Sequence, residues 1–147
     1  MNIFIPKKED IFSCAEVYIS AYGAKPWNEK YDKPSVEKYI SDYLGSETKQ
    51  CFAAEENGKI IGIALGIIVP SIDAPFLRIE DFCVSAEAQG RGYGKEIMRL
   101  VSEKAKESGC DSVILATLRN FPSHKFYLKN GFSEVDSVLL YKELPER

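Results

Sequence analysis

The segment Gln89–Gly94 has the composition and position of a ligand-binding turn. It reads Gln-Gly-Arg-Gly-Tyr-Gly, follows an apolar run and opens a stretch with helical periodicity. Backbone N–H groups in such a turn, together with the positive end of a helix dipole, can bind an anion such as a phosphate. The turn is neither a Walker loop, which ends in Gly-Lys-Ser or Gly-Lys-Thr, nor a dinucleotide fingerprint. A tight connection between a strand and a helix is the other interpretation of the same residues.

Two adjacent carboxylates, Glu80 and Asp81, lie in the apolar run Leu77–Val84 that precedes this turn, and either one could act as a general base. In a regular strand successive side chains point to opposite faces, so only one of the two faces a given cleft. Either Glu80 or Asp81 could therefore face the cleft, and we expect the other one on the opposite face of the strand. A surface or ion-paired carboxylate is the alternative interpretation of Glu80.

Composition excludes several classes of protein. The 147 residues are 45% hydrophobic and carry 19 basic against 22 acidic side chains, for a net charge of −3. These values predict a single globular domain over residues 1–147 and no nucleic-acid partner, because binding to a phosphate backbone normally needs a basic excess. Cys14, Cys51, Cys83 and Cys110 form no close pair, and His124 is the single histidine. We therefore expect buried reduced thiols and no metal site.

The sequence also predicts no membrane segment. Its longest apolar run, Ile60–Val69, stops at Pro70 and is shorter than the roughly 18 residues that a spanning helix needs. The N-terminus has no apolar stretch behind a basic start, so it does not resemble a secretory signal. We expect a cytoplasmic protein.

Periodicity and turn residues predict an α+β fold with a mixed sheet. Asn57-Gly58 is a strong hairpin signal between two runs rich in β-forming residues, and the aromatic-rich connection Gly23–Pro34 shows no period and predicts a long loop. The predicted strands are Asn2–Ile5, Gln50–Glu55, Ile60–Val69, Leu77–Val84, Ser112–Leu118 and Val138–Leu144, and the predicted helices are Asp10–Tyr22, Pro34–Leu44, Gly94–Ser108 and Pro122–Lys129.

Two sequence blocks resemble the GNAT N-acetyltransferase superfamily. Gln89, Gly92 and Gly94 fit its pattern of Gln or Arg, two residues, Gly, one residue, and Gly or Ala. A second block reproduces the pattern Asn-x-x-Ala-x-x-Phe-Tyr-x-Lys-x-Gly-Phe with serine in place of alanine, at Asn120, Ser123, Phe126, Tyr127, Lys129, Gly131 and Phe132. The resemblance runs from about Gln50 to the end of the chain, whereas the first 45 residues match only in their helix-loop-helix layout.

The resemblance implies a layered α/β/α fold: a largely antiparallel central sheet, about four flanking helices, and a parallel strand pair splayed around a coenzyme A site. It also implies acetyl-CoA as the donor. Asn120 would face the pantetheine arm, and the Val84 backbone N–H would polarise the thioester carbonyl. The residues implied for the pyrophosphate and its surroundings are Gln89, Gly90, Arg91, Gly92, Tyr93, Gly94 and Lys95.

The expected chemistry is direct attack by a primary amine on the thioester in a ternary complex. Alkylamines are mostly protonated at pH 7, and presenting the neutral form of an amine with a pKa near 10.4 costs roughly 4.6 kcal/mol. Such a reaction needs a general base. The string around Glu80 is similar to that of polyamine acetyltransferases, which supports Glu80 as the base. Tyr127 lies where the family places the general acid that protonates the leaving thiolate, although a core tyrosine is the alternative.

The acceptor site is expected on the long loop, where Pro26-Trp27-Asn28-Glu29 is similar to a string in aminoglycoside acetyltransferases. Aromatic faces and carboxylates would suit a small cationic amine, although Trp27 could instead anchor the loop to the core. Competing functions are a protein N-terminal or lysine acetyltransferase and a non-catalytic acyl-CoA-binding module. The oligomeric state is left open, with a homodimer as one arrangement. The acceptor-binding candidates are Tyr22, Trp27, Glu29, Tyr31, Glu80 and Asp81.

Overall fold

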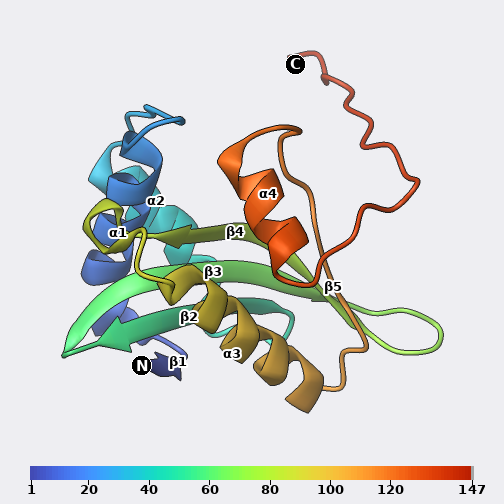
Figure 1. The fold of residues 1–147 in the computed structure, drawn as a ribbon, viewed down its shortest axis with the longest axis horizontal. Helices are drawn as coiled ribbons and strands as arrows, with labels where there is room; N and C mark the ends of the chain where they lie inside the picture. Colours follow the sequence, from blue (N-terminus) through green and yellow to red (C-terminus); the bar gives the residue numbers. More distant parts are fainter. Residues whose placement is uncertain (147) are drawn as a thin grey trace. The chain divides into compact units, whose positions relative to one another are not determined.

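A five-stranded mixed sheet forms the centre of residues Met1–Leu115 (Figure 1). The computed structural model describes Met1–Glu146, and the chain divides into two compact units at Leu115. The elements are β1 (Asn2–Phe4), α1 (Ile11–Gly23), α2 (Lys33–Ser41), β2 (Lys49–Glu56), β3 (Lys59–Val69), β4 (Phe76–Val84), α3 (Tyr93–Glu107), β5 (Val113–Leu115) and α4 (Pro122–Lys129), with short 3₁₀ turns at Lys8–Asp10 and Ala86–Ala88.

The strand order is β1-β2-β3-β4-β5, so each strand pairs with its neighbours in the sequence. The first three pairings are antiparallel and the last, between β4 and β5, is parallel. Asn57 and Gly58 both have positive φ at the turn between β2 and β3, as the hairpin signal predicts. The predicted α+β fold with a mixed, largely antiparallel sheet is confirmed.

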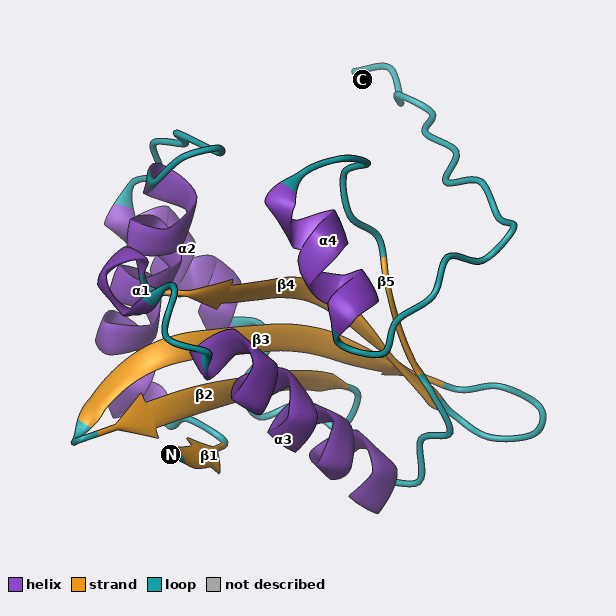
Figure 2. Ribbon diagram, in the orientation of Figure 1, coloured by secondary structure: helices purple, strands orange, loops and turns teal. Residues whose placement is uncertain are grey.

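The two faces of the sheet are covered by different helices (Figure 2). Alternate side chains of β3, including Ile63 and Leu65, join a buried cluster with the apolar sides of α1 and α2. The β3 residues that alternate with these point to the other face of the sheet, which α3 covers. A Cβ at Gly62 would lie 2.6 Å from Cδ1 of Ile97 on α3, so glycine at this position allows the helix to approach the strand closely.

The N-terminal helices begin at residues that satisfy exposed backbone groups. Asp32 caps α2, because its Oδ2 accepts a hydrogen bond of 3.0 Å from the Ser35 N–H, and Pro34 lies in the first turn. Before α1, Asp10 Oδ2 accepts a 2.8 Å hydrogen bond from the Lys7 N–H. The four cysteines are buried and free, as predicted.

Two predicted strands differ from the structure. The strand expected at Ser112–Leu118 is limited to Val113–Leu115, where it pairs with β4. The strand expected at Val138–Leu144 is wrong, because this segment forms no strand and its side chains are exposed, with Leu140 86% exposed. Residues of high β propensity form a strand only where a partner strand and a packing surface are present, and propensity alone does not supply them.

Between Met1 and Glu146 there is no helix of the length and hydrophobicity that crossing a bilayer requires.

Candidate active site

An irregularity in β4 brings Glu80 and Asp81 to the same face of the sheet. On the neighbouring strand β3, Leu65 pairs with Asp81 and the next residue, Gly66, pairs with Ile79, so Glu80 is an extra residue at a β-bulge. The bulge interrupts the alternation of side chains. The prediction that the two carboxylates point to opposite faces is therefore wrong, because it assumed a regular strand.

Contacts on both sides of the bulge define this shared face. Arg78 Nε donates a 2.7 Å hydrogen bond to Glu80 Oε1, as residues two apart on one face can do. The Glu80 side chain is 33% exposed. Asp81 lies opposite Leu65, which is buried against α1 and α2, so its carboxylate points toward these helices.

Three tyrosine hydroxyls converge on Asp81. Tyr39 of α2 donates to Oδ2 at 2.5 Å, while Tyr22 and Tyr18 of α1 donate to Oδ1 at 3.0 and 3.5 Å. Burial raises the pKa of Asp81, the Tyr39 and Tyr22 hydrogen bonds act in the opposite direction, and the nearby charge of Glu80 adds to the increase. Burial also raises the pKa of Tyr22 and Tyr39, so both phenols remain hydrogen-bond donors at neutral pH.

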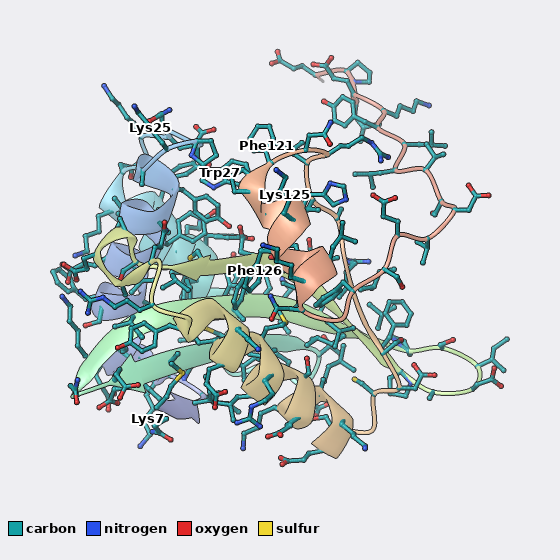
Figure 3. All side chains as sticks on the ribbon, in the orientation of Figure 1. Lys7, Lys25, Trp27, Phe121, Lys125 and Phe126 are labelled. Carbon is teal, nitrogen blue, oxygen red and sulfur yellow. The ribbon has the colours of Figure 1, made fainter. Side chains whose placement is uncertain are left out.

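An aromatic cluster continues from these tyrosines into the loop after α1. The ring centroids of Tyr18 and Tyr22 are 4.6 Å apart, Tyr31 lies 5.6 Å from Tyr18, and Trp27 lies 5.9 Å from Tyr22. Figure 3 shows Trp27 on this loop. The Glu29 N–H donates a 2.8 Å hydrogen bond to the Tyr22 carbonyl, which fixes the loop to the end of α1.

The structure thus brings together most of the predicted acceptor-binding residues. Tyr22, Trp27, Tyr31 and Asp81 belong to one cluster, and Glu80 lies on the same face of β4. Glu29 joins the cluster through its backbone, and its side chain is exposed. Sequence reasoning missed Tyr18 and Tyr39. The spacing of Tyr18 and Tyr22 four residues apart was the available signal, since such residues share a helix face.

The turn Gln89–Gly94 presents backbone groups to an open space at the start of α3. Gly90 and Gly92 both have φ of +80°, and a Cβ at either position would meet no atom within 4 Å. Gly92 caps α3, whose first N–H groups have no acceptor within the helix. The exposed side chain of Arg91 adds positive charge. This geometry fits an anion such as a pyrophosphate.

The end of β4 directs backbone groups away from β3. The Ser85 N–H donates to the Ile61 carbonyl at 2.8 Å, and the alternating pattern of an antiparallel pair then turns the N–H groups of Phe82 and Val84 to the other edge. Pairing with β5 on that edge covers only Leu77–Ile79. Gln89 Nε2 donates to the Val84 carbonyl at 2.9 Å and so ties the turn to the strand end. Phe82 was not a predicted residue, although it is two residues from Val84 and shares the direction of its N–H.

Asn120 and Tyr127 belong to the second unit, which begins at Ala116. Tyr127 is buried between Phe126 and Phe132, with both ring centroids at 5.3 Å. Asn120 has a φ of +66°, and its N–H donates a 3.1 Å hydrogen bond to His124 Nδ1. Figure 3 shows Phe126 on α4. The roles implied for Asn120 and Tyr127 stay predictions.

Residues 12–132 match the family described as Acetyltransferase (GNAT) family. A probable glucosamine 6-phosphate N-acetyltransferase from Oryza sativa subsp. japonica is 43% identical over 113 residues, which cover 63% of this chain and 67% of that protein. The chain spans a smaller share of two other curated relatives, 14% of one and 43% of the other.

Solved structures extend the comparison over nearly the whole chain. A protein described as a putative acetyltransferase from Agrobacterium tumefaciens is 25% identical with a TM-score of 0.79, covering 97% of this chain and 100% of that one. An aminoglycoside antibiotic 6'-N-acetyltransferase from Acinetobacter haemolyticus is 17% identical with a TM-score of 0.78, covering 99% and 100%. At this identity the second structure shows a common fold.

Proposed function

Because this chain belongs to the acetyltransferase (GNAT) family, we propose that it transfers an acetyl group from acetyl-CoA to a primary amine of a small cationic molecule. The observation that carries the choice of acceptor is the bulge, which places Glu80 and Asp81 on one face beside an aromatic cluster. Carboxylates and aromatic rings both attract ammonium groups. Relatives of this chain include proteins named as acetyltransferases of glucosamine 6-phosphate and of aminoglycosides.

The fit of acetyl-CoA rests on the turn Gln89–Gly94. The backbone of Gly90 and Gly92 is open to solvent and leaves room for a pyrophosphate, which the N–H groups at the start of α3 and the charge of Arg91 would hold. Acetyl-CoA supplies the acetyl group as a thioester. The family resemblance assigns polarisation of its carbonyl to the Val84 N–H, which the alternation of β4 turns away from β3.

The two carboxylates would have different roles toward the amine. Asp81 already accepts three tyrosine hydroxyls and would attract and orient the ammonium group. Glu80 is partly exposed and engages Arg78 through Oε1, so Oε2 is the candidate atom to take the proton. Tyr127 would protonate the departing thiolate, a role that rests on the family resemblance.

Electrostatics favours a cationic acceptor over a phosphorylated sugar. A phosphate near Asp81 and Glu80 would be repelled, whereas an amine with further positive charges would be attracted. The natural test is a thiol-release assay over polyamines, aminoglycosides, amino acids, glucosamine 6-phosphate and peptides. We expect turnover with small polycationic amines. Turnover confined to peptides or to glucosamine 6-phosphate would contradict this assignment of the acceptor. If no candidate acceptor caused thiol release, the enzyme function would be contradicted.

A further inference from the structure

The sheet holds Arg78 and Glu80 very differently. Arg78 has a partner on each side, because it pairs with Ile67 of β3 and with Ile114 of β5. Glu80 is the extra residue of the bulge, and in the part of the chain that the structure describes it pairs with no residue of β3 or β5. The sheet therefore fixes the backbone of Arg78 more firmly than that of Glu80.

The side chain of Glu80 depends on Arg78 for its position. Arg78 Nε donates a 2.7 Å hydrogen bond to Glu80 Oε1, and among the residues from Met1 to Glu146 this is the only hydrogen bond or ion pair of the Glu80 side chain. A glutamate without contacts samples many rotamers, because its χ angles rotate freely. A general base must instead stay within hydrogen-bond reach of the proton that it takes. The Arg78 bond is the contact that provides this restraint.

The chemistry of arginine suits such a role. A guanidinium group is always protonated and only donates hydrogen bonds, so Arg78 cannot take the proton in place of Glu80. Its Nε binds Oε1, which leaves Oε2 without a donor among the described residues. The positive charge of Arg78 opposes a cationic amine, but the carboxylates of Glu80 and Asp81 on the same face outnumber it.

A contribution to folding alone is a weaker explanation of this ion pair. The side chains of Arg78 and Glu80 are 49% and 33% exposed, and ion pairs at such exposure contribute little to stability. Arg99 of α3 forms comparable ion pairs with Glu96 and Glu103, and its side chain is 53% exposed. Arg99 therefore serves as a matched control.

We propose that Arg78 is a positioning residue for the acetyl transfer: its Nε–H holds Glu80 by Oε1, so that Oε2 is available to take the proton of the amine. Arg78 acts through Glu80 and contacts neither the amine nor acetyl-CoA. This inference rests on the proposed function, in which Glu80 is the general base.

Steady-state kinetics with acetyl-CoA, and with spermidine as the probe amine, tests the proposal. Arg78→Met removes the donor and the charge but keeps an unbranched stem. We expect kcat to fall by about fivefold, the size of one partly exposed charged pair, while the KM values of spermidine and acetyl-CoA stay close to those of the wild type. Arg78→Lys should regain most of kcat, because an ammonium N–H can replace the single bond from Nε. Arg99→Met should keep the wild-type kcat.

A double variant shows whether Arg78 acts through Glu80. In the background of Glu80→Gln, where the base is already lost, Arg78→Met should lower kcat no further. A second readout needs no turnover. The ¹⁵N signal of the Arg78 Nε–H should exchange with solvent faster in Glu80→Ala than in the wild type, because alanine offers no acceptor.

Three kinetic results would overturn the inference: a wild-type kcat in Arg78→Met, an effect of this substitution on either KM value in place of kcat, or independent effects of Arg78→Met and Glu80→Gln that multiply. Equal exchange of the Arg78 Nε–H in the wild type and in Glu80→Ala would also overturn it. A wild-type kcat in Glu80→Gln would contradict the proposed base, and this inference with it. Failure of Arg78 as a positioning residue is thus distinguishable from failure of Glu80 as the base.

Discussion

Replacing Tyr39 with phenylalanine tests whether the tyrosine hydroxyls stabilise Asp81 as an ionised carboxylate. The substitution removes the 2.5 Å hydrogen bond to Oδ2 and keeps the ring that packs against Tyr43. Hydrogen bonds to charged groups contribute about 1.5–3 kcal/mol. Asp81 keeps Tyr22 and Tyr18 as donors. We therefore expect the unfolding free energy to fall by about 1.5 kcal/mol, the lower end of this range. For a chain of this length that is a decrease of about 5 °C in Tm.

The distances predict a ranking and a coupling. Tyr22→Phe, which removes a 3.0 Å bond, should cost less than Tyr39→Phe, and Tyr18→Phe, at 3.5 Å, should cost least. In the background of Asp81→Asn, the cost of Tyr39→Phe should shrink, because the charge that strengthens the bond is gone. Urea unfolding of the four variants and the double variant measures both effects.

The pH dependence has a defined sign. Burial raises the pKa of Asp81 above its ordinary value of 3.8, so its contribution to stability is complete below that pH and is lost as the pH rises through the pKa of the folded state. The Tyr39 hydrogen bond lowers this pKa, and Tyr39→Phe should raise it further. The difference in unfolding free energy between the wild type and Tyr39→Phe should therefore grow between pH 4 and pH 7. The reasoning would be refuted if Tyr39→Phe lost the same unfolding free energy at pH 4 and pH 7. It would also be refuted if Tyr18→Phe were the most destabilising of the three substitutions.

Three further predictions concern the reaction. At one hundred times its Kd, acetyl-CoA should stabilise the folded protein by about 2.7 kcal/mol and so raise its Tm. Gly92→Asp should abolish this increase in Tm, as measured by differential scanning fluorimetry. The control Gly45→Asp, at a glycine with a similar positive φ, should keep it. Glu80→Gln should lower turnover at neutral pH by about one hundredfold and regain part of it at high pH, as measured in a pH–rate profile. Tyr127→Phe should lower kcat and kcat/KM together in steady-state kinetics while acetyl-CoA binding survives, as expected for a group that acts only in the transition state.

Much of the fold could be predicted because its signals are local. Helical spacing marked α1, α2 and α3, and Asn57-Gly58 marked the hairpin between β2 and β3. The missing strand at Val138–Leu144 shows the limit, because pairing depends on a partner elsewhere in the chain and local propensity carries no information about it.

The candidate site was predictable in its residue types and less so in its geometry. Glu80, Asp81, Tyr22 and Trp27 could be selected from chemistry and from the resemblance, but their relation depends on the register between β3 and β4. A bulge has no reliable sequence signal, and one extra residue reverses the facing of every side chain that follows it.

The bulge also explains how two adjacent carboxylates can have different roles. In a regular strand one of the two carboxylates would point to the opposite face of the sheet. With the extra residue at Glu80, both face α1 and α2, yet their surroundings differ: Asp81 is held by three hydroxyls, while Glu80 is partly exposed beside Arg78. Three hydroxyl donors occupy most of the acceptor positions of the Asp81 carboxylate, whereas Glu80 is partly exposed and its Oε1 accepts from Arg78. The proposed function gives proton removal to Glu80 and attraction of the amine to the charge of Asp81. If it holds, Asp81→Asn should act mainly on the KM of the amine and Glu80→Gln on kcat.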